Sequence, residues 1–240
     1  DAQDHTLIEN SDYSKIISKI NNISFVDLRN IALDKVSSNP ILENRGVSPL
    51  TTEKELYIYL RNYGNMHYEK IKSAINLLPF NDDVSLSNSF KNIEIIDWGC
   101  GQAIATITLL ESLKSTDIYN ATITLIEPSE ITIKRAALHV NVFGKQCCEN
   151  DPQIKTICKY IDDIQSIDIK TNPDKIKIHL FSNILDVETF SLTHLENIIS
   201  DTQKGINYFV CASPYINDYK TERLDSFKRY FKRYSSFTNS

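Results

Sequence analysis

The stretch IEIIDWGCGQAIATITLLESL, residues 93–113, carries the strongest structural signal in the chain. An apolar run ends in an acid, Asp97, and Gly99 and Gly101 follow before a helical pattern begins. The whole chain has only six glycines. Glycine allows left-handed dihedrals and close backbone approach, so its use here needs a reason. The stretch predicts a buried strand, a tight turn and a helix. The turn is either a simple reversal or a surface for a ligand.

Length and composition are those of a globular protein. The chain has 240 residues, of which 41% are hydrophobic and 24% charged. No apolar run reaches the roughly 18 residues of a membrane-spanning helix, so we expect no membrane insertion. The first ten residues, DAQDHTLIEN, are polar and acidic, unlike a secretory signal peptide. The net charge of −5 argues against strong non-specific binding of nucleic acid by the whole surface.

The cysteines indicate the redox environment. There are five, an odd number, and no two of them have C-x-x-C spacing. A disulfide framework or a zinc site would need a different pattern. We therefore expect free thiols, no metal ion and a reducing, cytoplasmic location.

The chain divides into two regions of different pattern. Residues 1–90 predict helices joined by short polar loops, and we interpret them as a helical subdomain or lid. There, Thr52 and Glu55 predict a capping box, Gly64 is expected to split the helix that follows, and Asn65 to cap its second half. From residue 91 to 240, short β-branched runs alternate with helical stretches. This pattern predicts an α/β domain with a doubly wound, mostly parallel Rossmann-like sheet.

The expected elements of residues 91–240 follow from this alternation. Strands are predicted at 93–97, 122–127, 156–160, 175–182 and 207–212. Helices are predicted at 103–115, 129–143, 187–200 and 221–234. The last helix is basic, and an apolar face made by Leu224, Phe227, Phe231 and Tyr234 makes it amphipathic. The alternative is a surface for nucleic acid or a partner.

The position of the glycine turn favours a ligand. In an open α/β sheet the ligand lies beyond the carboxyl ends of the strands, where the next helix offers free N–H groups. A dinucleotide fingerprint, G-x-G-x-x-G, would place its third glycine at Ile104, which is too large for close packing. No G-K-[ST] follows to make a phosphate loop. Asp97 would oppose a pyrophosphate but suits a cationic amine, which disfavours a nicotinamide-dependent oxidoreductase.

The segment IIDWGCGQA resembles motif I of the class I S-adenosylmethionine-dependent methyltransferases, with Ala103 at the last small position. The resemblance extends over residues 93–212. It implies a Rossmann-like fold, S-adenosylmethionine as cofactor and methyl transfer to an acceptor. By this resemblance, Gly99 and Gly101 would line the methionyl part of the cofactor, and Asp97 would contact its amino group.

Further residues are implied by the same resemblance. Glu127 would bind both ribose hydroxyls, and Asp162, with Asp163 as the alternate, would bind the adenine amino group. Asn183, next to Ser182, would face the methyl-transfer site. The implied cofactor-binding set is Asp97, Gly99, Cys100, Gly101, Glu127, Pro128, Asp162 and Asn183. Simpler alternatives stay open: Asp97 as a turn acid, Glu127 as an acid near a helix start, and Asp162 as a surface charge.

Methyl transfer requires little acid–base catalysis, because the methyl group is already activated. The protein mainly positions the nucleophile and excludes water, and needs a base only where the nucleophile carries a proton. The catalytic candidates are Asn183, Tyr215 and His67, and Tyr63 and Tyr68 could join His67 in covering the cofactor. No Asn/Asp-Pro-Pro-Tyr follows the fourth strand. The methyl acceptor stays open: RNA, protein or a small molecule.

One departure from the family is expected at the C-terminal end. The family's sheet usually ends in a sixth and a seventh strand, but only SSFTNS follows the last predicted helix. We expect these strands to be absent and a partner chain or a missing C-terminal region to complete the sheet edge. The alternative function is therefore a methyltransferase-like binding or regulatory module within a larger protein or complex, without activity of its own.

Overall fold

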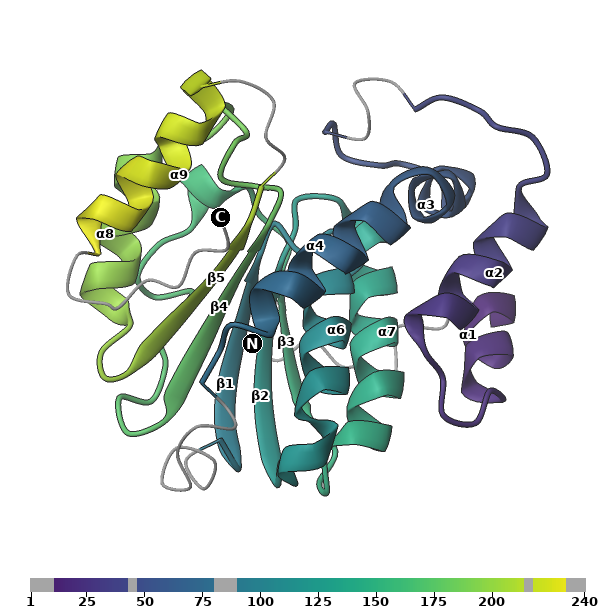
Figure 1. The fold of residues 1–240 in the computed structure, drawn as a ribbon, viewed down its shortest axis with the longest axis horizontal. Coiled ribbons are helices and arrows are strands. Elements are labelled where there is room, and N and C mark those ends of the chain that lie inside the picture. Colours follow the sequence, from purple (N-terminus) through teal and green to yellow (C-terminus); the bar gives the residue numbers. More distant parts are fainter. Residues whose placement is uncertain (1–10, 43–46, 80–89, 214–217, 232–240) are drawn as a thin grey trace.

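The computed structural model describes residues 11–42, 47–79, 90–213 and 218–231 (Figure 1). Their centre is an open sheet of five parallel strands in the order β3-β2-β1-β4-β5. The strands are β1 (Asn92–Trp98), β2 (Asn120–Ile126), β3 (Gln153–Ile157), β4 (Ile176–Ser182) and β5 (Asn207–Ala212). The order reverses beside β1, so the carboxyl ends of β1 and β4 form the switch point where such sheets bind ligands. The chain has the predicted α/β fold.

Helices cover both faces of the sheet (Figure 1). On one face lie α4 (Asn65–Ile75), α6 (Ile104–Leu113) and α7 (Glu130–Cys147), and on the other lie α8 (Leu192–Thr202) and α9 (Asp218–Tyr230). The remaining helical elements are α1 (Ser11–Ser18), α2 (Phe25–Lys35), α3 (Glu53–Tyr59), the π-helical segment η3 (Leu60–Gly64) and the 3-10 turns η4 (Lys114–Thr116) and η5 (Ile161–Asp163). Two of the N-terminal helices pack on helices that cover the sheet: α1 contacts α7, and α2 contacts α6.

Side chains of β1 alternate between two hydrophobic clusters. Ile93 and Ile95 pack into the cluster that contains α6 and α7, whereas Ile96 and Trp98 pack into the cluster that contains α8. This alternation is the period of two of a strand buried on both faces. It directs Asp97, which lies between Ile96 and Trp98, toward α6. The pattern of the strand thus decides which layer the acid meets.

The N-terminal helices share the first of these clusters. Tyr13, Phe25 and Leu28 belong to it together with Ile107 of α6 and Phe143 of α7. The shared core holds residues 53–75, which we call the cover segment and which comprise α3, η3 and α4, against the parallel sheet. The division into a helical subdomain and a cofactor domain at residue 90 stays a prediction.

The predicted break at Gly64 is wrong. Tyr59, Gly64 and Asn65 all have right-handed helical dihedrals, so α3, η3 and α4 run on without interruption, and Asn65 caps nothing. A Cβ atom at Gly64 would lie 3.2 Å from Cζ of Phe25, which explains the glycine by close packing rather than by a turn. The Thr52–Glu55 capping box is confirmed.

Two further boundaries differ from the sequence prediction. The third strand is β3, three residues earlier than predicted, at the edge of the sheet. Its exposed Gln153 and half-buried Lys155 interrupt the apolar pattern by which a strand is predicted from sequence. An edge strand tolerates such polar residues. Helix α8 begins only at Leu192, since Ser191 caps it by accepting a hydrogen bond from the backbone N–H of His194.

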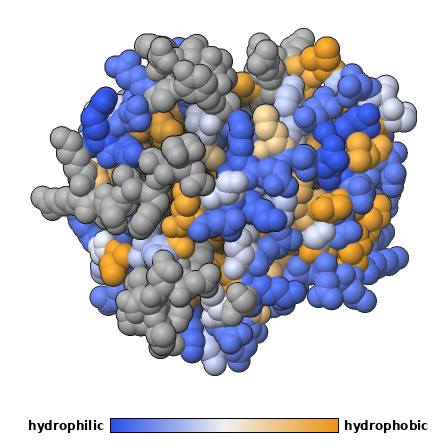
Figure 2. Space-filling model, in the orientation of Figure 1, coloured by the Kyte–Doolittle hydropathy of each residue, from blue (hydrophilic) through white to orange (hydrophobic). Residues whose placement is uncertain are grey.

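The amphipathic interpretation of the last helix is confirmed. Phe227 of α9 is buried in the cluster beneath α8, and Leu224 and Phe231 pack against it. Tyr234 lies outside the described residues. The face drawn in Figure 2 is mainly hydrophilic, with apolar residues in small groups. Within the described residues, no helix is long and apolar enough to cross a membrane, and no group of three or more His, Cys, Asp or Glu could hold a metal ion.

Candidate functional site

The turn after β1 has an unusual backbone. Gly99, Gly101 and Ala103 have positive φ angles of 61°, 52° and 63°. A left-handed conformation costs a residue with a Cβ roughly 1–2 kcal/mol, so Ala103 is held there by its surroundings. The turn is closed by hydrogen bonds from the N–H of Cys100 to the carbonyl of Ile126, and from the N–H of Ala103 to that of Cys100, both at 2.8 Å.

The two glycines serve different purposes. A Cβ atom at Gly99 would lie 2.8 Å from both Cγ1 and Cδ1 of Ile184, in the loop after β4. Gly99 therefore lets the β1 turn and the β4 loop approach each other. A Cβ atom at Gly101 would meet no described atom within 4 Å. The outer face of Gly101 is open, which is where a ligand could lie against the backbone.

Asp97 is buried beneath this turn with one oxygen satisfied and one not. Its Oδ2 accepts a hydrogen bond of 2.7 Å from Oγ1 of Thr106, on α6. Its Oδ1 is buried and has no hydrogen-bond partner among the described residues. Burial raises the pKa of Asp97 to about 7, against the opposing effect of the Thr106 hydrogen bond. A buried acceptor without a partner is costly unless a donor arrives.

Glu127, immediately after β2, ties two backbone segments together. Its Oε2 accepts from the N–H of Gly101 at 3.2 Å, and its Oε1 accepts from the N–H of Ser129 at 3.0 Å. Burial raises the pKa of Glu127. The two backbone N–H groups fix the orientation of the carboxylate, which stands at the rim of the open Gly101 face.

Cys100 and Pro128 contribute backbone rather than reactive side chains. The Cys100 thiol is buried, and burial raises its pKa well above the ordinary value. Its Sγ donates to the carbonyl of Gly101 at 3.4 Å, and Sγ of Cys158 donates to the carbonyl of Pro128 at the same distance. All five cysteines of the chain are free thiols.

Asn183 begins the loop after β4 in a strained backbone conformation, with φ at 57°. Its N–H donates to the carbonyl of Ala212 at 2.6 Å, and its Nδ2 lies 3.3 Å from Oγ of Ser182. Its buried Oδ1 has no partner among the described residues, and neither has Oδ1 of Asp186 three residues later. Because Ile184 packs on Gly99, this loop adjoins the β1 turn, and its open acceptors resemble that of Asp97.

The cover segment brings an aromatic group to the same edge of the sheet. The hydroxyl of Tyr59 lies 3.1 Å from Nδ1 of His67, and the rings of Tyr59, Tyr63 and His67 contact one another. Burial, with a smaller effect of the Glu127 charge, raises the pKa of Tyr59. Burial lowers the pKa of His67 to about 4, and the charge of Asp186 opposes that shift. With its pKa lowered in this way, His67 is neutral at pH 7.

The cover segment is bound to the turn by hydrogen bonds. Nε2 of Gln102 donates to the carbonyl of Leu56 on α3 at 2.9 Å. The carbonyl of Gln102 accepts from Nδ1 of the buried His139 at 2.8 Å, and Nε2 of His139 accepts from the hydroxyl of Tyr13 on α1 at 2.5 Å. These contacts hold the glycine turn between the sheet and the N-terminal helices.

Of three other predicted residues, two have partners elsewhere in the described chain and one lies outside the described residues. Asp162, in η5, is exposed, and its Oδ1 accepts from the N–H of Ser191 at 2.8 Å, which fixes the start of α8. Tyr68 stacks on Phe25 with 4.4 Å between ring centroids. Tyr215 lies outside the described residues. The cofactor-binding roles inferred from the sequence stay predictions.

Sequence reasoning missed three residues of the group: Thr106, Tyr59 and Asp186. A threonine one turn into the helix after the glycine turn was the available signal for Thr106, because that position faces the end of the strand. Tyr59 lies in a stretch with a helical pattern, and no motif marks it as a site residue. Asp186 lies in the loop after β4, and no pattern in the sequence marks its position.

The chain has distant likenesses to two solved structures. No protein-family model and no curated protein matches the chain. A geranyl diphosphate C-methyltransferase from Streptomyces coelicolor A3(2), solved with S-adenosyl-L-homocysteine, is 12% identical over 93% of this chain and 78% of its own, with a TM-score of 0.39. A putative class I S-adenosylmethionine-dependent methyltransferase from Listeria monocytogenes is 12% identical over 95% and 77%, with a TM-score of 0.37. Similarity this distant carries no argument about what the chain binds.

Proposed function

We propose that the chain binds S-adenosylmethionine at the glycine turn and transfers its methyl group to an acceptor. The observation that carries the proposal is the buried Oδ1 of Asp97, which has no partner among the described residues and lies beneath a turn whose Gly101 face is open. A cationic amine entering there would donate to this oxygen and stabilise the ionised carboxylate, whose pKa of about 7 reflects its burial.

The surrounding residues fit the rest of this cofactor. Glu127 is oriented by two backbone N–H groups, and each of its oxygens keeps a lone pair for a ribose hydroxyl. Asn183 offers an open amide oxygen from the neighbouring loop. The left-handed Gly99 and Gly101 leave the backbone accessible to the methionyl part. Asp162 keeps one oxygen for the adenine amino group, since only Oδ1 is used by Ser191.

The bound cofactor would supply an activated methyl group on a sulfonium. The chain's own residues would do the remaining work. Tyr59, Tyr63 and His67 would exclude water from the carboxyl edge of the sheet, because the cover segment lies there. His67 is neutral, and in the tautomer whose Nδ1–H donates to the Tyr59 hydroxyl, Nε2 would be free to accept an acceptor's proton.

The proposal includes the setting of the reaction. Five free thiols fit a reducing, cytoplasmic compartment. The acceptor is RNA, a protein or a small molecule. Among the described strands β5 pairs only with β4, and we propose that a partner chain or a further C-terminal region completes this edge.

One observation favours the alternative of a binding or regulatory module. Both oxygens of Glu127 and one of Asp162 already accept backbone N–H groups within the chain. A domain that used these acids only to hold its loops would need no cofactor. The distinction depends on whether a cofactor competes for or adds to these contacts.

Calorimetric titration with S-adenosylhomocysteine at pH 8 tests the proposal. We expect a Kd in the micromolar range, about −8 kcal/mol, and a loss of at least tenfold in Asp97→Asn and Glu127→Gln. Asp201→Asn, at an exposed acid of α8, is the matched control and should bind like the wild type. No heat from a folded wild-type chain would reject cofactor binding by this chain and leave the module as the better account.

A further inference from the structure

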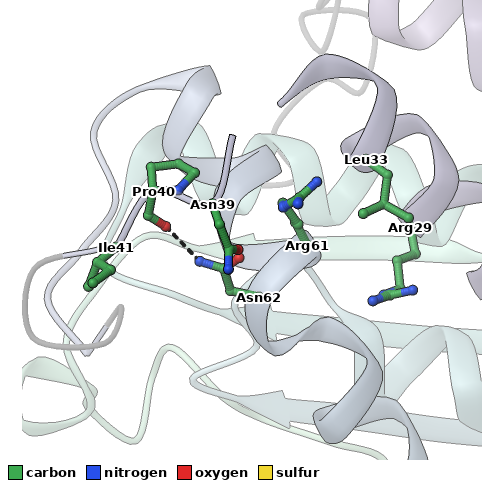
Figure 3. A pocket seen from close by; sticks show the side chains of 7 residues that line it. All are labelled: Arg29, Leu33, Asn39, Pro40, Ile41, Arg61 and Asn62. Carbon is green, nitrogen blue, oxygen red and sulfur yellow. Dashed lines mark hydrogen bonds between the residues drawn. The ribbon is translucent and has the colours of Figure 1, made fainter. Parts of the chain in front are cut away.

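A cavity lies away from the glycine turn, between α2, η3 and the segment of residues 39–41 (Figure 3). Its volume is about 320 Å3. Figure 3 shows Arg29 and Leu33 together on α2, with Arg61 and Asn62 of η3 beside them and the loop residues beyond. The cavity is lined by Arg29, Leu33, Asn39, Pro40, Ile41, Arg61 and Asn62. This lining carries two positive charges and no acid.

Neither arginine is neutralised by the described part of the chain. The ion pairs found there are Lys134–Glu130, Arg135–Glu53 and Lys159–Asp168, and none involves Arg29 or Arg61. Arg61 donates from Nη1 to the carbonyl of Val36 at 2.9 Å. Among the described lining residues, therefore, no carboxylate balances the two arginines.

Both arginines also present an unused donor. The Nε atom of Arg29 and that of Arg61 are buried, and no described residue accepts from either. A buried guanidinium N–H without an acceptor is unfavourable, so an anion that reaches either arginine would relieve that donor. The Nε–H and an adjacent Nη–H form a fork that matches two oxygens of an oxyanion.

The donors come from separate elements, which selects the shape of the anion. Arg29 extends from α2 and Arg61 from η3, so they approach from different directions. A planar carboxylate fits one such fork, whereas a tetrahedral phosphate can offer oxygens to both. A π-helical segment such as η3 is rare and occurs often at functional sites. The wall is braced by Asn62, whose Nδ2 donates to the carbonyl of Pro40 at 2.8 Å.

We propose that this cavity binds the phosphate group of a small phosphorylated molecule. The volume reaches the range of about 300–1,000 Å3 that small-molecule sites occupy, so it holds more than the phosphate alone. Leu33, Pro40 and Ile41 supply apolar surface for the body of the ligand, and the Ile41 side chain is 89% exposed. The inference stands on Arg29 and Arg61 and does not depend on methyl transfer.

Titration of the whole chain with phenyl phosphate and with inorganic phosphate tests the proposal. Phenyl phosphate combines a phosphate with an apolar body, and we expect it to bind with a Kd on the order of 1 mM or lower. Inorganic phosphate should bind severalfold more weakly, because it lacks contacts with Leu33 and Pro40. Neither probe resembles S-adenosylmethionine, so failure at the glycine turn would leave this result unchanged.

Variants of Arg29 separate the site from general electrostatics. Arg29→Gln should weaken phenyl phosphate at least tenfold, and Arg29→Lys, which keeps the charge but lacks Nε, should weaken it by a smaller factor. Lys35→Gln makes the same charge change at an exposed position of α2 outside the cavity and should leave binding within twofold. Binding unaffected by Arg29→Gln, an equal loss in Lys35→Gln, or no binding to a folded wild-type chain would overturn the proposal.

Discussion

Asp97 and Trp98 are neighbours on β1, and their side chains point to opposite faces of the sheet. Their polar groups differ in how fully they are hydrogen-bonded. Nε1 of Trp98 donates to Nδ1 of His179 at 3.1 Å, and Nε2 of His179 lies 2.9 Å from Oδ1 of Asn207. Asn207 in turn donates from Nδ2 to the carbonyls of Gln203 and Gly205. On the other face, Oδ2 of Asp97 has a partner, Thr106, and its buried Oδ1 has none in the part of the chain that the structure describes.

The difference separates structure from function. Because the indole N–H can only donate, Nδ1 of His179 accepts and its Nε2 carries the proton, so every polar atom of the Trp98 chain is used. A network satisfied in this way specifies the packing of the sheet. An acid left half satisfied at the carboxyl end of the same strand is what we would expect of the proposed cofactor site, where a partner comes from outside. Four predictions sharpen or break this comparison.

The largest effect on stability is expected on the satisfied face. His179→Leu would remove the acceptor of Trp98 and the donor to Asn207, leaving two buried polar groups unpaired. We expect the free energy of unfolding to fall by about 3 kcal/mol, measured by urea denaturation. His194→Leu is the control, because His194 loses a single hydrogen bond, to Ile164, and should cost about 1 kcal/mol. Equal costs in the two variants would contradict the network.

The two turn glycines show the same contrast: Gly99 serves packing, and Gly101 borders open space. In Gly99→Ala, the new methyl group would meet Ile184 at 2.8 Å in a left-handed conformation, and we expect a loss of about 2–3 kcal/mol of unfolding free energy. In Gly101→Ala, the conformation is similar but the space is open, so the loss should be about 1 kcal/mol. Thermal denaturation compares them, and a Gly101 variant as unstable as the Gly99 variant would show that the outer face is not open.

The pH dependence of stability tests the state of Asp97. Burial raises its folded-state pKa to about 7, above its ordinary value of 3.8. Between these values the folded chain binds more protons than the unfolded chain, so this group makes unfolding easier as the pH rises from 5 to 7. Asp97→Asn cannot ionise, and its stability relative to the wild type should therefore improve by about 1–3 kcal/mol between pH 5 and pH 8. Denaturant titrations of both proteins across this pH range provide the measurement. If the two unfolding free energies change with pH in the same way, Asp97 does not titrate in this range.

The sequence predicted the fold because the signals for it are local. Alternating β-branched runs predicted all five strands, and the glycine turn predicted a helix start at residue 103, one residue before the observed Ile104. Close packing of Gly64 on Phe25 could not be predicted, since it joins residues distant in the chain. The same limit applies to the site. Asp97 and Glu127 are marked by their positions at strand ends, but Thr106, Tyr59 and the capping contact of Asp162 depend on how helices pack.

The central claim is that the open oxygen of Asp97 awaits a cation, and the pH dependence of cofactor binding tests it most directly. Calorimetric titration of S-adenosylhomocysteine from pH 6 to pH 8 should give a wild-type affinity that rises by up to about tenfold as Asp97 ionises. Asp97→Asn should bind at least tenfold more weakly at pH 8, with little dependence on pH. A wild-type affinity that does not change with pH, or an Asp97→Asn variant that binds as tightly as the wild type, would contradict the account.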